Sequence, residues 1–215
     1  MIISTNKFNL KKEIQNTNKK IYQPNNQISC ILAPSWGENM IIEKYGYEII
    51  QKLIEKNIKV YFRPHPRSVQ LNFKIIKRIL NKFNNNNNFV YNPKISSIKD
   101  MYYSNFMISD WSGAAIEYSI VFKKPILFID TLPKIKNHEY LKINIEPLEK
   151  KLRNKIGKII YPNSIDDIYN YILDVIYLNK NNKFDYEAVY KAYYYNCHNA
   201  TEICANELSK LYLKQ

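Results

Sequence analysis

Three short polar segments of the sequence combine residue types that can bind and process phosphate groups. In the first, "RPHPRS" (63–68), Arg63 and Arg67 flank His65, which lies between two prolines. Proline restricts the backbone on both sides of the histidine, so a stiff extended turn presents the imidazole. Arginine suits bidentate contact with phosphate oxygens, and a histidine beside it could act as a general base or donate to a phosphate oxygen. The structural alternative is a turn in which His65 caps a carbonyl.

The second segment, "SDWSG" (109–113), follows a short apolar stretch and precedes a run of small residues. Backbone N–H groups are free at the start of a helix, and a phosphate group can bind there. Serine is also a preferred N-cap residue. The residues alone therefore leave open two interpretations, an ordinary helix capped by Ser112 and a phosphate site made by Ser109, Ser112 and Gly113.

The third segment, "APSWGEN" (33–39), contributes Ser35 and Trp36. Each of the three segments follows a predicted strand, because continuous apolar runs are typical of buried parallel strands. The predicted strands are residues 28–34, 58–64, 89–92, 106–109 and 125–130. Helical spacing of apolar residues follows at 41–54, 71–83, 96–105, 165–176 and 186–213, the last with a break near 196–199.

This alternation of strands and helices predicts an α/β fold with a parallel sheet that helices cover on both faces. We expect a single Rossmann-like domain over residues 28–215 with a helical C-terminal tail, after a polar N-terminal segment at 1–27. Ligands of such sheets bind at the carboxyl ends of the strands. The three polar segments should therefore converge on one crevice, and this convergence is the argument for a site.

The composition indicates a globular protein with an anionic partner. Of 215 residues, 46% are hydrophobic, and the net charge is +13. No apolar run could span a bilayer, the N-terminus lacks the apolar core of a secretory signal, and three cysteines without disulfide spacing favour the cytoplasm. The charge is spread over many lysines, which argues against a dedicated nucleic-acid surface and leaves phosphorylated substrates or anionic lipid.

A metal site at Cys197, His198 and Cys204 is conceivable, because positions seven apart share a helix face. It lacks a fourth ligand and a Cys-x-x-Cys pair, so buried or unreactive cysteines are favoured. The sequence also has no G-x-x-x-x-G-K motif, which counts against an ATPase. We therefore expect neither a metal ion nor a cofactor.

Five motifs in order resemble those of the CDP-glycerol glycerophosphotransferase family, which includes teichoic-acid polymerases and primases. In this sequence they read "APSWGE", "RPHP", "SDWSG", Glu117 in the next helix and "KKPILFID" (123–130). The resemblance covers roughly residues 30–135. It implies the C-terminal, nucleotide-binding half of a GT-B enzyme that moves glycerol phosphate from CDP-glycerol to a hydroxyl and releases CMP.

The resemblance also implies roles for single residues. His65 matches the catalytic histidine of the family and is expected to be the general base in an in-line attack on the donor's β-phosphorus. Asp110 is expected to orient either His65 or the loop. Either Trp36 or Trp111 could stack on the nucleobase of the donor or simply pack against other side chains of the protein. The residues expected to bind the donor are Ser35, Trp36, Arg63, Arg67, Ser109, Ser112, Gly113 and Glu117.

The chain also departs from the family pattern. Gly37 stands where the family has an arginine, and Gly113 replaces a serine, which leaves only a backbone N–H. About 27 residues precede the first strand, whereas a two-domain enzyme would need an N-terminal acceptor domain, so three alternatives stay open: a truncated product that lacks this domain, a half that pairs with a partner subunit, and a non-catalytic remnant. The acceptor would be a membrane-linked glycan, and the basic surface would hold a cytoplasmic protein on the inner face of an anionic membrane.

Two other functions remain open on the sequence. A GT-B glycosyltransferase of surface-polysaccharide synthesis would use the same crevice for a nucleotide sugar, and the unfamiliar segment at 137–162 favours it. A non-catalytic basic binding protein would instead show a steep salt dependence and no nucleotide selectivity.

Overall fold

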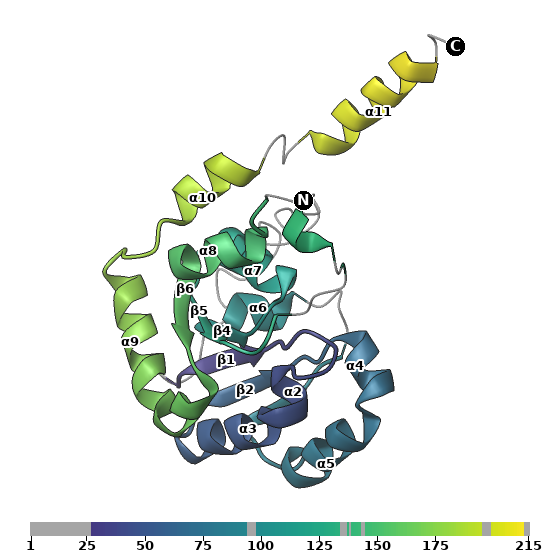
Figure 1. The fold of residues 1–215 in the computed structure, drawn as a ribbon. Coiled ribbons are helices and arrows are strands. Elements are labelled where there is room, and N and C mark those ends of the chain that lie inside the picture. Colours follow the sequence, from purple (N-terminus) through teal and green to yellow (C-terminus); the bar gives the residue numbers. More distant parts are fainter. Residues whose placement is uncertain are drawn as a thin grey trace.

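One six-stranded parallel sheet organises the chain (Figure 1). The computed structural model describes residues 27–93, 98–133, 137, 139–142, 145–194 and 199–212. The strands are β1 (Ser29–Leu32), β2 (Lys59–Phe62), β3 (Phe89–Tyr91), β4 (Phe106–Ser109), β5 (Ile126–Ile129) and β6 (Gly157–Ile160). Their order in the sheet is β3-β2-β1-β4-β5-β6, which confirms a Rossmann-like fold with its topological switch point between β1 and β4.

Helices cover both faces of this sheet. Their bounds are α2 (Ile41–Lys44), α3 (Gly46–Glu55), α4 (Pro66–Leu71), α5 (Phe73–Phe83), α6 (Lys99–Tyr103), α7 (Gly113–Phe122), α8 (Leu148–Ile156), α9 (Ile168–Lys180), α10 (Tyr186–Tyr193) and α11 (Ala200–Tyr212). Short 3₁₀ turns lie at Tyr140–Lys142 and Pro162–Asp167. Apolar side chains of α3, α5 and α9 pack on one face, and those of α7, α8 and α10 pack on the other.

The strands supply both cores because their side chains alternate between the two faces. In β1, Cys30 and Leu32 join the core under α3, whereas Ile31 joins the core under α7. Burying one Leu or Ile side chain completely stabilises the fold by about 1.5–3 kcal/mol. Burial also raises the pKa of the Cys30 thiol, so this cysteine is a core residue, as expected.

The five predicted strands are all present, but three details of the prediction were wrong or incomplete. Leu71 does not share the buried face of α5, because it ends the separate helix α4 and is 62% exposed. The sequence pattern did not predict α8 or β6, and β6 forms one edge of the sheet. The predicted helix at 96–105 is α6, and its expected first residues, Ser96 and Ser97, lie outside the described residues.

The C-terminal tail contains α10, which ends at Tyr193, and α11, which begins at Ala200, and most of the predicted break near 196–199 lies outside the described residues. Tyr186 and Val189 of α10 pack into the core beside α7. By contrast, α11 has no buried residue and extends away from the sheet (Figure 1). None of the described helices is long and apolar enough to cross a membrane. The N-terminal segment lies outside the described residues except for Gln27.

Candidate functional site

A cavity of about 960 Å³ lies at the carboxyl ends of β1, β2 and β4, and we call it the three-loop cavity. Residues of all three polar segments line it, so the predicted convergence is confirmed. Further lining residues come from α6, from the chain between β5 and α8, and from the first turn of α8. The residues that the three segments and α7 contribute are Ala33, Pro34, Ser35, Trp36, Arg63, Pro64, His65, Pro66, Trp111, Ser112, Gly113, Ala114 and Glu117.

Two neighbouring residues at the end of β4 hold the loop that follows β1. Oδ1 of Asp110 accepts a hydrogen bond from the backbone N–H of Ser35 at 2.8 Å, and Oδ2 accepts one from Ile41 at 3.2 Å. Ile41 begins α2, so the carboxylate also satisfies a helix N-terminus. The hydroxyl of Ser109 donates to the carbonyl of Ala33 at 2.7 Å. The loop is thereby fixed from beneath the cavity.

These contacts change the expected roles of both β4 residues. Ser109 is completely buried and is not among the residues that line the cavity, so its hydroxyl organises the loop where a phosphate contact was expected. Asp110 is 1% exposed, and burial raises the pKa of its carboxyl against the opposing effect of its hydrogen bonds. Of the two roles considered for Asp110, orienting His65 or organising the loop, its hydrogen bonds support the second.

The start of α7 is open towards the cavity. Ser112 occupies the N-cap position, but its hydroxyl makes no hydrogen bond to the helix backbone. Gly113 follows, and a Cβ atom there would meet nothing within 4 Å. Glu117, one turn further along, also lines the cavity. An uncapped helix start that faces a cavity suits an anion, so the geometry favours the phosphate interpretation of this segment.

His65 is the N-cap of α4, and its Nδ1 accepts a hydrogen bond from the backbone N–H of Arg67 at 3.1 Å. It therefore caps an N–H group, not a carbonyl. A ring nitrogen that accepts carries no proton, so the neutral imidazole bears its proton on Nε2. In this orientation His65 is a hydrogen-bond donor through Nε2. A role as general base would require the ring to release Arg67.

The two arginines beside His65 occupy different environments. Arg63 lines the cavity and is 8% exposed, and burial lowers the pKa of its guanidinium. Arg67 is exposed and is not among the residues that line the cavity, so its expected phosphate contact stays a prediction. Its guanidinium lies 4.5 Å from the centre of the Trp36 ring, and that ring centre is 6.0 Å from the centre of the His65 ring. Arg67 thus packs on Trp36, whose side chain lines the cavity.

The side of the cavity nearest β5 was not predicted. Trp111 belongs to it, and its indole N–H donates to the carbonyl of Thr131 at 2.8 Å, which indicates a packing role for this tryptophan. No phosphate-binding pattern marks the following chain, and its only signal was its position after a strand at the same sheet edge. The lining residues from this part are Pro133, Asn137, Tyr140, Pro147, Glu149 and Lys150.

Nothing in the described ranges indicates a metal centre. Within them, no group of three or more His, Cys, Asp or Glu side chains is placed to hold a metal ion. Cys204 is exposed on α11, while Cys197 and His198 lie outside the described residues.

The fold is a Rossmann-like domain of the GT-B type, and its cavity lies at the topological switch point, where ligands of such sheets bind. The sequence matches the family model of CDP-glycerol:poly(glycerophosphate) glycerophosphotransferase over residues 7–147. Since this match covers more than half of the chain, the protein belongs to that family of transferases. The comparison with curated protein sequences finds no match.

Solved structures of the wall teichoic acid polymerase TagF share the fold. One has 15% sequence identity and a TM-score of 0.50, over 95% of this chain and 49% of that chain. A TagF variant gives 14% identity and a TM-score of 0.53, over 95% of this chain and 48% of the other. A TagF variant soaked with CDPG has 15% sequence identity and a TM-score of 0.50, over 95% of this chain and 47% of that chain. This chain therefore spans about half the length of these polymerase structures.

Proposed function

We propose that this chain binds CDP-glycerol in the three-loop cavity and transfers its glycerol phosphate to a hydroxyl of a cell-surface glycan or teichoic-acid-type acceptor. The observation that carries the proposal is that Arg63, His65 and the open start of α7 line one cavity in a member of a glycerophosphotransferase family. The TagF structure soaked with CDPG supports the choice of donor.

In this proposal the diphosphate lies at the start of α7. Backbone N–H groups and the free Ser112 hydroxyl bind its oxygens, since the helix dipole favours an anion there. Arg63 supplies positive charge from a buried position, where an ion pair is screened less by water. Glu117 accepts hydrogen bonds from the ribose hydroxyls. Trp36, held by Arg67, offers a flat apolar face to the cytosine ring.

The transfer is an in-line displacement at the β-phosphorus. A bond forms between the acceptor oxygen and that phosphorus, and the bond from phosphorus to the oxygen that bridges to CMP breaks. CMP leaves with the bonding electron pair, and the acceptor hydroxyl loses its proton to water late in a loose transition state. Such a reaction depends mostly on positioning and charge stabilisation, for which Arg63, His65 and the helix start are suited.

For His65 we propose the role of donor to a phosphoryl oxygen. Its Nδ1 accepts the Arg67 N–H, so the neutral ring carries its proton on Nε2, the atom that would donate to the ligand. The base role expected from the family resemblance would need that hydrogen bond to break first. Asp110 acts as a positioning residue through its hydrogen bonds to Ser35 and Ile41.

The test is CMP release from CDP-glycerol with a lipid acceptor that ends in glycerol phosphate. His65→Ala should lower kcat roughly 100-fold, as loss of a transition-state donor does. His65→Gln keeps an N–H donor and should retain part of the activity. If His65 is instead the base, both variants fail alike and the wild type shows an acidic limb near pH 6.5, about the pKa of free histidine. Equal release by all three proteins would contradict the proposal.

We further propose that a second domain or subunit presents the acceptor. The TagF structures are about twice as long as this chain, and α11 offers a helix that the described part of the chain does not cover. Its exposed apolar residues are Ile203, Leu208, Leu211 and Tyr212. Deleting residues 200–215 should leave the unfolding midpoint unchanged and abolish transfer while CDP-glycerol still binds. Full transfer by the shortened chain would exclude a role for α11.

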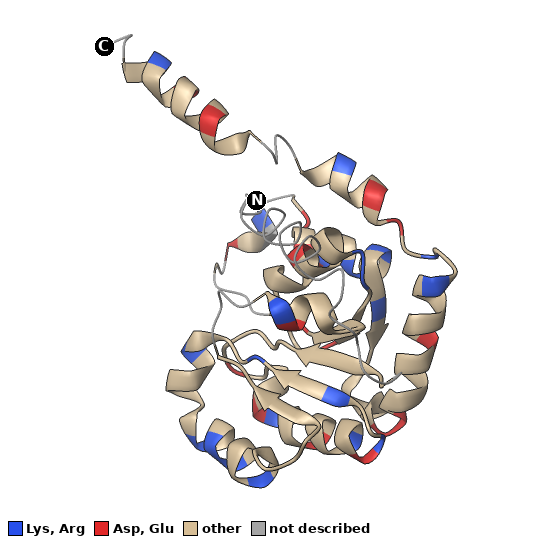
Figure 2. Ribbon diagram, turned by 180° about the vertical axis from the view of Figure 1, so that it is seen from behind, with Lys and Arg blue, Asp and Glu red and all other residues tan. Residues whose placement is uncertain are grey.

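A basic helix suits the protein to the cytoplasmic face of an anionic membrane. Figure 2 shows Lys and Arg gathered along α5, which has no acidic residue. Each cation near such a leaflet contributes about 1 kcal/mol. The exposed apolar and basic residues on α5 and the adjacent end of α4 are Leu71, Phe73, Lys74, Lys77, Arg78 and Lys82. Lys74→Glu with Lys77→Glu should reduce co-sedimentation with phosphatidylglycerol vesicles, whereas Lys210→Glu on α11 should not. Equal sedimentation of the two variants would contradict this surface.

A further inference from the structure

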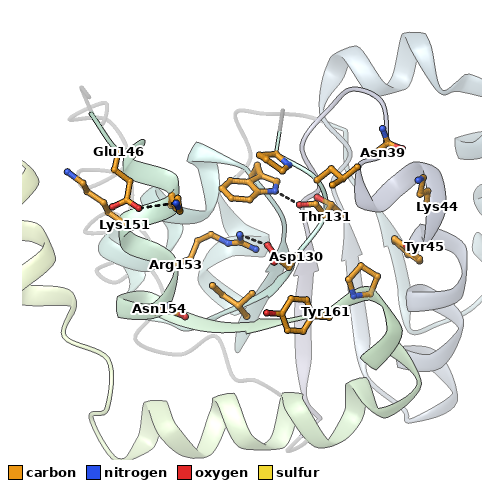
Figure 3. A pocket seen from close by; sticks show the side chains of 16 residues that line it. Asn39, Lys44, Tyr45, Asp130, Thr131, Glu146, Lys151, Arg153, Asn154 and Tyr161 are labelled. Atoms are coloured by element: carbon orange, nitrogen blue, oxygen red, sulfur yellow. Dashed lines mark hydrogen bonds and ion pairs between the residues drawn. The ribbon is translucent and has the colours of Figure 1, made fainter. Parts of the chain in front are cut away.

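A second cavity, of about 910 Å³, adjoins the three-loop cavity, and we call it the Arg153 cavity (Figure 3). Trp111, Pro133 and Lys150 belong to the walls of both cavities. The remaining wall comes from α2, the ends of β5 and β6, and α8. Arg153 lies outside the five family motifs and does not line the three-loop cavity, although Trp111 and Asp130 of those motifs line the Arg153 cavity.

Arg153 is a buried cation with only part of its hydrogen-bonding capacity used. The side chain is 4% exposed, and its Nη1 donates to Oδ1 of Asp130 at 2.7 Å. The guanidinium carbon lies 4.3 Å from the centre of the Trp111 ring and 5.1 Å from that of Phe128. Two aromatic rings and one carboxylate therefore hold the guanidinium in place. Figure 3 shows it directed at Asp130 within the cavity lining.

The unused donors of Arg153 lie along one edge of its guanidinium. Neither Nε nor Nη2 has a hydrogen-bond partner among the described residues. The N–H bonds on this edge run side by side, at the spacing of two oxygens of a phosphate or carboxylate group. Both nitrogens are themselves buried, and buried donors of a charged group are nearly always satisfied, so a pair without a partner in a side chain that lines a cavity calls for an acceptor. A ligand with two adjacent oxygens would supply it.

The cavity also has positive charge that no described carboxylate neutralises. Lys150 pairs with Glu146 at 3.4 Å, and Arg153 pairs with Asp130. Lys44 and Lys151 line the same cavity and form no ion pair with any residue that the structure describes. Figure 3 shows these two lysines on opposite sides of the lining. Two uncompensated cations favour a phosphate group over a singly charged carboxylate.

We propose that the Arg153 cavity is a second phosphate-binding site, in which Nε and Nη2 of Arg153 bind two oxygens and Lys44 and Lys151 balance the charge. None of these three residues lines the three-loop cavity, so phosphate binding here can be tested apart from the proposed transfer reaction, on which only the polymer source below rests. The phosphate can come from two sources. One is a phosphodiester link of a polyol-phosphate chain that enters beside the donor, and the other is free inorganic phosphate.

The test uses Trp111 as the reporter, because its ring stacks on Arg153. The chain has two tryptophans, so Trp36→Phe leaves Trp111 as the only one. In this background we expect a saturable fluorescence change on titration with inorganic phosphate and with glycerophosphoglycerol, a phosphodiester. Tighter binding of the diester assigns the site to a polymer, and tighter binding of inorganic phosphate assigns it to the free ion. His65→Ala should leave both affinities unchanged, since His65 belongs to the other cavity.

Matched variants distinguish phosphate binding at this site from nonspecific attraction of phosphate to the basic protein. Arg153→Lys keeps the charge but removes the paired donors, and should weaken phosphate binding at least tenfold. Lys44→Ala with Lys151→Ala should weaken it several-fold, whereas Lys74→Ala with Lys82→Ala removes the same charge from α5 and should not. If circular dichroism shows that Arg153→Lys does not fold, the comparison of the Lys44/Lys151 variant with the Lys74/Lys82 variant tests the proposal instead. The proposal is overturned by wild-type affinity in folded Arg153→Lys, by equal affinities of the lysine pairs, or by a signal that sodium chloride of equal ionic strength reproduces.

Discussion

The carboxylate of Asp110 binds the backbone N–H of Ser35 at 2.8 Å, although the two residues are 75 positions apart in the sequence. This contact joins the end of β4 to the loop after β1 at the switch point of the sheet. The same loop carries Trp36, which lines the three-loop cavity. The shape of the cavity therefore depends on a buried group that does not itself line it.

Asp110→Asn tests this dependence. Asparagine keeps the shape of the side chain but has one carbonyl oxygen for two N–H donors, those of Ser35 and Ile41. One donor would then be left unsatisfied, and we expect a loss of about 1–3 kcal/mol of the free energy of unfolding, measured by urea denaturation. A variant as stable as the wild type would show that the carboxylate does not hold the loop.

The difference in the free energy of unfolding between the wild type and Asp110→Asn should also depend on pH, in a direction that the pKa of Asp110 defines. Burial raises the pKa of Asp110 in the folded state above the unfolded value of about 3.9, so the folded state binds the proton more tightly. Stability from this group is then fully present below the unfolded pKa and falls as pH rises towards the folded one. Asparagine does not titrate, so the stability gap between the two proteins should narrow above about pH 4. A gap that widens would contradict the raised pKa.

Ser112 and Asp185 occupy N-cap positions but differ in what their side chains do. Oδ1 of Asp185 accepts a hydrogen bond from the backbone N–H of Ala188 at 2.9 Å, whereas the Ser112 hydroxyl makes no such bond. Asp185→Ala should lower the free energy of unfolding by about 1 kcal/mol, and Ser112→Ala by less than about 0.5 kcal/mol. The affinity for CDP-glycerol should show the opposite order. Ser112→Ala should weaken binding roughly tenfold, because it removes a hydrogen bond to a charged group, and Asp185→Ala should weaken it less.

Chemical denaturation and calorimetric titration of both variants check this reversal. Ser112→Ala should weaken CDP-glycerol binding without a matching loss of stability, and Asp185→Ala should do the opposite. If Ser112→Ala instead costs stability and leaves the affinity intact, Ser112 is an ordinary helix cap.

Two glycines provide a further contrast. A Cβ atom on Gly113 would meet nothing within 4 Å, whereas one on Gly157 would lie 2.1 Å from the carbonyl oxygen of Ile126. Gly157→Ser should therefore destabilise the fold by about 3 kcal/mol or more, because neighbouring strands would have to separate. Gly113→Ser should leave stability unchanged or slightly higher, since serine has the better helix propensity. Thermal unfolding of the two variants measures this difference.

Gly113→Ser also adds a hydroxyl to the wall of the three-loop cavity, where the family resemblance expects a second serine. We expect CDP-glycerol to bind a few-fold more tightly to this variant, as one added hydrogen bond would produce. Weaker binding would mean that the diphosphate approaches the backbone at Gly113 too closely for any side chain.

The sequence was sufficient for five of the six strands and for the three polar segments that line the three-loop cavity. Buried strands such as β1 and β4 are continuous apolar runs, and each ends in a segment whose residue types are unusual for a loop. The edge strand β6 was missed because it is short, contains Lys158 and follows a lysine-rich helix without a turn signal. Its first residue, Gly157, is required by the close approach of Ile126, which is a tertiary contact without a local sequence pattern.

Side-chain direction was the part of the site that the sequence could not supply. Ser109 and Arg67 were expected to contact the ligand, yet one points into the sheet and the other lies over Trp36. Arg153 stands in the basic stretch "LEKKLRNKI" (148–156), where nothing local separates the single buried cation from its exposed neighbours. Its burial is set by packing against Trp111 and Phe128, from other parts of the chain.

The most direct test of the account is a calorimetric titration of the purified chain with CDP-glycerol, CMP, UDP-glucose and UMP, repeated on Arg63→Lys. We predict saturable binding of the cytidine ligands in preference to the uridine ligands. Arg63→Lys should weaken that binding roughly tenfold, because a buried bidentate donor is lost. Preference for UDP-glucose would instead make the protein a nucleotide-sugar glycosyltransferase, and failure to bind any of the four would contradict the assignment of the three-loop cavity as a donor site.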